Sequence, residues 1–240
     1  MKSATLYITT VLIWGSTWLA IEFQLGDIAV ELSLFYRFAI AALLMWLYVA
    51  YKKPDMRFSL IDHGFFALLA ICNFALNYLM LYWAQNYLTS AMTSIAFSLL
   101  LVMNIVNTRL FFGKPISKRI YTGAALAVLG ITCLFWPQLQ QFDLSNGALV
   151  GLLLALGGTF VASLVLQGNV WGMLYSAIGL ALYVLMNDVQ FSLNAPTSYW
   201  LSLLYLSIFG TVIAFGCYFA LLKNIGPEKA SYVIVLFPLV

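Results

Sequence analysis

Long apolar runs alternate with short polar segments along the whole chain. The hydrocarbon core of a bilayer is about 30 Å thick, so a helix rising 1.5 Å per residue needs about 20 apolar residues to cross it. By this measure the pattern predicts nine membrane-spanning helices, at 4–23, 32–51, 64–83, 90–112, 120–136, 147–166, 171–189, 198–222 and 230–240. The first run is long enough to span and has no small-residue cleavage site, which favours a permanent helix over a signal peptide.

The composition predicts that the outside of the molecule faces lipid. Hydrophobic residues make up 64% of the 240 residues and charged residues only 8%, whereas soluble chains have about 45–50% and about 25%. Water-soluble, disordered, collagen-like and nucleic-acid-binding classes are therefore excluded. The three cysteines, Cys72, Cys133 and Cys217, lie singly in apolar runs, a pattern typical of packing residues rather than of a disulfide or metal site.

Basic residues fall almost entirely on one side of the predicted membrane. When the segments between successive predicted helices are assigned alternately to the two sides of the membrane, ten of the eleven lysines and arginines lie on one side: Lys2, Lys52, Lys53, Arg57, Arg109, Lys114, Lys118, Arg119, Lys223 and Lys229. The loops of the other side carry Asp27, Glu31, Asp143 and Asp188 and no basic residue. The positive-inside rule then places the amino terminus in the cytoplasm.

The chain also resembles itself. A shift of 137 residues brings Tyr82-Trp83-Ala84 over Phe219-Ala220-Leu221, so the third and fourth helices correspond to the eighth and ninth. We therefore predict two repeats, residues 1–136 and 147–240, which insert with opposite orientation because each has an odd number of helices. The second repeat contains four predicted helices against five. We expect that a basic loop after Leu164 and a tenth helix after Val240 are missing from this sequence.

No enzyme motif is present in the sequence. Neither GxxxxGK[ST], HExxH nor GxSxG occurs, and the single histidine, His63, lies in a predicted cytoplasmic stretch. We expect no enzymatic activity, no cofactor and no metal. The remaining classes are a secondary transporter, a channel and a non-catalytic membrane protein.

Two ionisable residues, Glu22 and Arg37, lie within predicted helices. A charge at the bilayer centre costs about 2.5–3.5 kcal/mol on insertion scales, so it usually faces a partner or a watery cavity. We expect the two side chains to form a polar pair. In the first case their role is structural: they form an ion pair, or Glu22 reaches the interface alone. In a second case they are part of the solute pathway. In the second case Arg37 would hold a carboxylate, and Glu22 an ammonium group or a coupling proton.

Aromatic and polar residues recur at helical spacing on particular helix faces. Any one of them could serve helix packing, but their abundance in the first, third, fourth, sixth, eighth and ninth helices favours a shared cavity. The candidate substrate-binding residues are Trp14, Trp18, Asn77, Tyr78, Tyr82, Ser94, Phe97 and Tyr218. Pro238 should bend the ninth helix and is a candidate gating hinge, although structural kinks are commoner. The fifth helix carries a small-residue seam, Gly123, Ala127 and Gly130, that suits helix packing or dimer contact.

Five segments resemble motifs of EamA-domain proteins of the drug/metabolite transporter superfamily. They are Trp14-Gly15-Ser16-Thr17-Trp18, Tyr87-Leu88-Thr89-Ser90-Ala91, Phe112-Gly113-Lys114-Pro115-Ile116-Ser117, Gly123 to Gly130, and Ile225-Gly226-Pro227-Glu228-Lys229-Ala230. The resemblance implies an all-α polytopic membrane protein of ten helices in two inverted five-helix repeats. It also implies a central cavity between helices one, three, four, six, eight and nine. YddG-type exporters of aromatic and other neutral amino acids are the most similar branch.

The resulting hypothesis is a secondary transporter of the bacterial inner membrane that exports small metabolites, such as neutral or aromatic amino acids, by alternating access. Its partners would be a small-molecule substrate and the lipid bilayer, with no nucleic acid, and the protein would be a monomer or a homodimer. Efflux of flat organic cations is a second hypothesis, since aromatic rings attract cations. A membrane sensor or scaffold that transports nothing is a third.

Overall fold

The computed structural model describes residues 2–112, 118–134, 136–140, 147–162 and 169–240, which form helices and no strand. The elements are α1 (Ser3–Glu22), α2 (Val30–Lys52), α3 (Leu60–Leu69), η1 (Ala70–Leu76), α4 (Asn77–Gln85), α5 (Ser90–Ser98), α6 (Leu100–Phe112), α7 (Lys118–Leu134), α8 (Trp136–Gln140), α9 (Ala148–Ala162), α10 (Asn169–Met186), α11 (Thr197–Tyr205), η2 (Leu206–Ile213), α12 (Ala214–Ile225), α13 (Pro227–Ala230) and η3 (Ser231–Leu239). The predicted all-α class is confirmed. The predicted loop after Leu164 lies outside the described residues.

Within the described residues, each predicted span corresponds to one helix or to consecutive helices. Five of these segments are long and apolar enough to cross a bilayer, namely Ser3–Glu22, Val30–Lys52, Leu60–Gln85, Ser90–Asn107 and Thr197–Ile225, and three shorter apolar helices accompany them. Large apolar side chains such as Leu126, Leu153 and Leu201 are exposed on the outside of the molecule. In a bilayer these side chains would contact lipid, as the composition predicts.

Side-chain caps mark the starts of α3 and α5. The third span begins at Leu60, four residues before the predicted start, because Ser59 and Asp62 form a capping box in which the Ser59 hydroxyl accepts from the Asp62 backbone N–H (3.2 Å). Thr89 caps α5 by accepting from the Met92 backbone N–H (3.2 Å). These caps satisfy backbone donors that have no partner within the helix.

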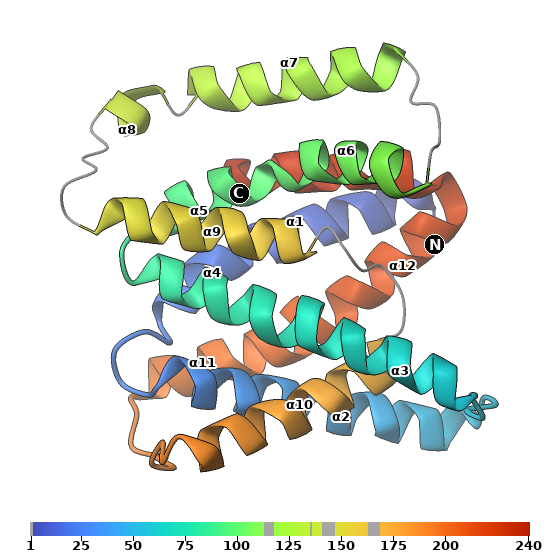
Figure 1. The fold of residues 1–240 in the computed structure, drawn as a ribbon, viewed down its shortest axis with the longest axis vertical. Coiled ribbons are helices and arrows are strands. Elements are labelled where there is room, and N and C mark those ends of the chain that lie inside the picture. The colour runs from blue at the N-terminus through green and yellow to red at the C-terminus, as the bar shows by residue number, and fades with distance from the viewer. Residues whose placement is uncertain (1, 113–117, 135, 141–146, 163–168) are drawn as a thin grey trace.

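The helices pack in pairs that are distant in sequence. In Figure 1, α2 lies along α10 and α4 along α9, while α7 and α8 lie at one edge of the molecule. Helix α1 contacts α12 and η3, so the first predicted repeat interleaves with the second. The largest apolar core joins α1, α2, α3, η1, α4, α10, η2 and α12 around Phe38 and Phe74, both fully buried.

The α-helical backbone is irregular in four spans. The third span contains the π-helix η1 and the eighth contains the π-helix η2. The fourth is interrupted at Leu99, and the ninth is the 3₁₀-helix η3. The shift of 137 residues found in the sequence moves η1 onto residues 207–213, against Leu206–Ile213 for η2. The two π-helices therefore occupy equivalent places in the predicted repeats.

Close packing of α9 on α4 depends on Gly158. A Cβ at this position would lie 3.1 Å from the backbone oxygen of Asn77 and 3.2 Å from the Met80 Cβ. We predict that Gly158→Leu lowers the melting temperature of the detergent-purified protein by about 5 °C, because overpacking costs about 1–3 kcal/mol. Gly179→Leu is the control, since a Cβ there meets nothing within 4 Å. Equal melting temperatures for the two variants would contradict this packing.

Candidate solute-binding cavity

A cavity of about 110 Å³ lies between the spans, lined by 18 residues of α1, α2, α3, η1, α4, α5, α6, α12 and η3. All four irregular spans contribute residues to the lining, but the eighth does so only through α12. Its π-helix η2 lies behind the wall, where Gly210 accepts a hydrogen bond from Trp14 and Thr211 accepts one from Arg37. Non-α backbone at membrane depth is tolerated where it lines a cavity or is buried in protein. The lining residues of the third and fourth spans, such as Asn73, Asn77 and Phe97, lie near the middle of those spans, and the binding sites of secondary transporters are found near the bilayer midplane.

The cavity brings together six of the eight candidate residues. Those that line it are Trp14, Trp18, Asn77, Tyr78, Phe97 and Tyr218. Tyr82 and Ser94 are buried but do not line it. The expected contribution from the sixth helix is also absent among the described lining residues: Thr159 of α9 is buried elsewhere and donates to the backbone carbonyl of Ala155 (2.7 Å).

Arg37 is the one charged side chain among the described residues of the cavity lining, and it is 1% exposed. Its Nε donates to Thr211 Oγ1 (3.0 Å) and its Nη1 to the Tyr82 hydroxyl (3.1 Å). The guanidinium carbon lies 4.7 Å from the ring centroid of Tyr78. Nη2 has no hydrogen-bond partner among the described residues, and it lies beside Gly210 of η2, 3.5 Å from where a Cβ at that position would be.

Both hydroxyl groups that hold Arg37 are oriented by a second hydrogen bond. The Thr211 hydroxyl donates to the backbone carbonyl of Leu206 (2.8 Å). The Tyr82 hydroxyl donates to Oε1 of Gln24 (2.8 Å). Each hydroxyl hydrogen is thereby used, so each oxygen presents a lone pair to Arg37. Tyr82 is thus a positioning residue behind the cavity wall and not part of its lining.

The predicted pair between Glu22 and Arg37 does not form. Glu22 is exposed at the end of α1, and its Oε1 accepts from the backbone N–H of Ser90 (3.2 Å) at the start of α5. A carboxylate is favourable there because the amino end of a helix carries partial positive charge. Arg37 instead satisfies its charge on hydroxyl groups and an aromatic face, so the two residues act at separate places.

Aromatic rings form the wall beside Arg37. The ring centroid of Trp14 lies 5.0 Å from that of Phe215 and 5.1 Å from that of Tyr218. Trp14 Nε1 donates to the backbone carbonyl of Gly210 (3.0 Å), which anchors the indole to η2. Trp18 and Phe97 form a second ring pair, with centroids 5.3 Å apart. These edge-on and tilted contacts keep the rings in fixed orientations.

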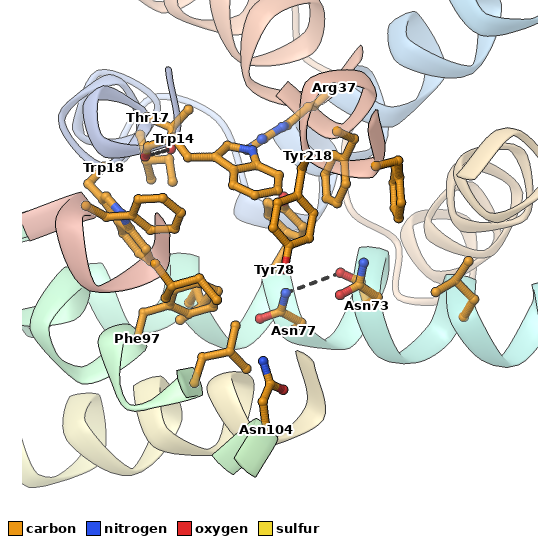
Figure 2. A pocket seen from close by; sticks show the side chains of 18 residues that line it. Trp14, Thr17, Trp18, Arg37, Asn73, Asn77, Tyr78, Phe97, Asn104 and Tyr218 are labelled. Carbon is orange, nitrogen blue, oxygen red and sulfur yellow. Dashed lines mark hydrogen bonds between the residues drawn. The ribbon is translucent and has the colours of Figure 1, made fainter. Parts of the chain in front are cut away.

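The side of the cavity away from Arg37 carries amides. In Figure 2, Asn73, Asn77 and Asn104 lie on that side, and the rings of Trp14, Tyr78 and Tyr218 lie between them and Arg37. The Asn77 side chain is 4% exposed, and its Nδ2 donates to the backbone carbonyl of Asn73 (3.2 Å). One end of the cavity is therefore cationic and the other is polar but uncharged.

The candidate set from the sequence missed several residues. Thr17, Asn73 and Asn104 line the cavity, and Gln24 supports it through Tyr82. The spacing of four between Asn73 and Asn77 was a usable signal, since it places both on one helix face. Pro238 lies half-buried in η3, and its role as a hinge stays a prediction.

Comparison with known proteins connects this architecture with transport. The profile of the EamA-like transporter family matches residues 1–136 and 145–240. An "Uncharacterized transporter in trpA 3'region" of Buchnera aphidicola subsp. Schlechtendalia chinensis is 23% identical over 98% of this chain and 81% of that protein. An "Uncharacterized transporter" of Haemophilus influenzae and "Protein PagO" of Salmonella typhimurium are also 23% identical over 98% of this chain, covering 80% and 81% of their own lengths.

One solved protein crystal structure has the same fold, with a TM-score of 0.68 and 17% sequence identity over 98% of this chain and 85% of the other. The helices, the central cavity and the named relatives define a multi-pass membrane transporter. The chain belongs to the EamA-like transporter family.

Removal of the Tyr82 hydroxyl should destabilise the fold. Tyr82→Phe takes away the group that joins Arg37 to Gln24 and leaves buried polar atoms unpaired, which costs about 1–3 kcal/mol. We expect a melting temperature lower by several degrees in detergent. Tyr183→Phe, on an exposed side chain of α10, is the matched control and should change little. If Tyr82→Phe were as stable as the control, the hydrogen-bonded support of Arg37 would be wrong.

Proposed function

We propose that the protein exports small neutral amino acids, aromatic ones included, across the bacterial inner membrane by alternating access of this cavity. The observation that carries the proposal is Arg37, a buried cation with a free Nη2 at the wall of an aromatic cavity. Arginine binds carboxylates through two parallel N–H donors and keeps its charge in a buried environment.

The charge of the cavity favours a substrate with a carboxylate. No aspartate or glutamate occurs among the described lining residues, so the positive charge of Arg37 is balanced only by hydroxyl and ring dipoles. A buried charge without a counter-charge is unfavourable. A bound carboxylate would supply that counter-charge and so would gain binding free energy from the site as it stands.

The size and the rings suit a molecule as large as an amino acid. One water needs about 10–15 Å³ of cavity volume, so a cavity of about 110 Å³ has room for roughly eight to ten non-hydrogen atoms. Phe215 and Tyr218 present aromatic surface on which an apolar or flat side chain can pack. A modest widening during the transport cycle would admit phenylalanine or tyrosine.

Efflux of organic cations is the competing hypothesis, and the aromatic lining favours it. The charge of Arg37 acts against it, because a cation that carries no carboxylate of its own would lie close to the guanidinium when it packs on the ring of Tyr78, whose centroid is 4.7 Å from the guanidinium carbon. Like charges at such separation in a medium of low dielectric repel strongly. A sensor or scaffold would need neither a site for carboxylates nor a site for cations.

Orientation and mechanism follow from charge and symmetry. The concentration of lysine and arginine on one side supports a cytoplasmic amino terminus. Two inverted repeats, residues 1–136 and 147–240, would rock about the midplane cavity to expose it to one side and then to the other. The matched π-helices η1 and η2 support this division. The outward direction rests on the resemblance to exporters.

The experiment is a flux assay in proteoliposomes with radiolabelled phenylalanine, tyrosine, leucine and the organic cation tetraphenylphosphonium. Transport of neutral amino acids, without transport of the cation, supports the proposal. Transport of the cation alone would favour drug efflux. Lack of flux for every solute, by protein that is folded and inserted, would favour a sensor or scaffold.

The Arg37 side chain should determine amino acid transport. We predict that Arg37→Gln lowers kcat/KM for phenylalanine by at least about tenfold, since hydrogen bonds to charged groups contribute about 1.5–3 kcal/mol. Arg37→Lys should retain part of the activity because it keeps the charge but loses the planar fork. Arg57→Gln, at an exposed residue of the segment between α2 and α3, is the control and should keep full activity. Full activity of Arg37→Gln would exclude Arg37 from carboxylate binding.

A further inference from the structure

Asn77 holds a buried acceptor that the fold leaves without a partner. Its Oδ1 is enclosed at the cavity wall and accepts no hydrogen bond from the described residues. The side chain as a whole is 4% exposed. Buried polar atoms in native proteins almost always have partners, and an exception in a binding cavity indicates a place for a ligand.

The π-helix η1 fixes the orientation of this amide. At the end of η1 the backbone N–H of Asn77 donates to the carbonyl of Cys72, five residues earlier, instead of to Asn73. The Asn77 side chain donates its Nδ2 to the Asn73 carbonyl (3.2 Å). A carbonyl can only accept, so the NH₂ end of the amide must face Asn73 and Oδ1 must be the free end. The free group is therefore an acceptor and not a donor.

The position of Asn77 decides which part of a substrate would reach it. Figure 2 shows the rings of Tyr78 and Tyr218 between Asn77 and Arg37. In an α-amino acid the ammonium and the carboxylate are bonded to the same carbon, so with the carboxylate on Arg37 both stay at the Arg37 end. The side chain then extends along the rings toward Asn77.

We infer that Asn77 Oδ1 accepts a hydrogen bond from an uncharged donor at the far end of the substrate's side chain. This rests on the proposed function and narrows its substrate class. The donor is uncharged because no described lining residue carries a carboxylate that would balance a cation. The phenol of tyrosine is such a donor: once the cavity widens as the proposed function requires, its ring can pack on the aromatic wall while its O–H reaches the amide.

The consequence is discrimination between two amino acids that differ in a single oxygen atom. With tyrosine bound, Oδ1 gains a partner, whereas phenylalanine leaves it buried and unpaired. Sites built to hydrogen-bond a substrate hydroxyl reject the analogue that lacks it, by up to about 10⁴–10⁵-fold. Asn73 and Asn104 also line the cavity and offer other polar groups near Asn77, so we expect a smaller discrimination than this upper value. The expected preference for tyrosine over phenylalanine is at least about tenfold in kcat/KM.

The test compares tyrosine with phenylalanine in proteoliposome flux for four proteins: the unaltered chain, Asn77→Leu, Asn77→Asp and Asn187→Leu. Asn77→Leu removes the acceptor at similar volume and should abolish the preference, mainly by improving phenylalanine. Asn77→Asp keeps an acceptor and should keep the preference. Asn187 is the matched control because its Nδ2 also donates to a carbonyl four residues back, Tyr183 (2.8 Å), but on an exposed surface.

The outcomes separate this inference from the proposed function. Equal transport of tyrosine and phenylalanine by the unaltered protein would overturn the inference and leave amino acid export standing. The same holds if Asn77→Leu keeps the tyrosine preference. Absence of flux for both amino acids would overturn the proposed function and the inference together. If Asn77→Leu failed to fold, the unaltered protein and Asn77→Asp would still test the inference: both should prefer tyrosine to phenylalanine, and loss of the preference in either would overturn it.

Discussion

A polar group that this chain carries inside the hydrocarbon is costly unless it has a partner in the protein or faces a cavity, because lipid offers no hydrogen bonds. This constraint explains where the irregular features of the fold lie. Two π-helices, a helix break at Leu99 and a 3₁₀-helix are all placed at or directly behind one cavity. Carbonyl groups that the irregular backbone releases, such as those of Asn73 and Gly210, are used by side chains of the lining.

Arg37 shows how a buried charge is tolerated under this constraint. Hydroxyl groups of Thr211 and Tyr82 accept from it, and each is oriented by donating elsewhere. The ring of Tyr78 adds a favourable contact with the cation. These contacts support the charge when the cavity is empty. No described lining residue carries a carboxylate that neutralises it, so binding of an anion would still be favourable. In a transporter, such a balance lets a carboxylate enter and leave again.

The sequence was sufficient for the architecture and insufficient for the details of the site. The thickness of the bilayer sets the length of an apolar run, and the positive-inside rule sets the side on which basic residues lie. Both can be recognised without knowledge of tertiary contacts, so the spans could be predicted within a few residues. The π-helices could not, since they differ from α-helices by a single hydrogen-bond register that hydropathy does not record. The partners of Arg37 were also beyond reach, because Tyr82 and Thr211 are 45 and 174 residues away.

The nearby acidic residue was misleading for the same reason. Glu22 and Arg37 are joined by a short turn, yet Glu22 is the last residue of α1 and lies at the surface, where it accepts a hydrogen bond from the start of α5. The two residues are near each other in sequence, but Glu22 lies at the surface and Arg37 is buried, so they do not form a pair. Asn77 could be selected by its helix face, but the identity of its free atom required the backbone geometry of η1.

The central claim is that side chains from both halves of the chain meet around one water-accessible hollow. Thiol labelling tests it most directly, in a background where Cys72, Cys133 and Cys217 are replaced by alanine. Single cysteines at Asn104, on the cavity lining, and at Leu153, on the apolar outside of α9, would be treated with a charged thiol reagent in open membrane fragments. The account predicts rapid labelling at position 104, slowed by substrate, and little labelling at 153. Equal, slow labelling at both positions would contradict it.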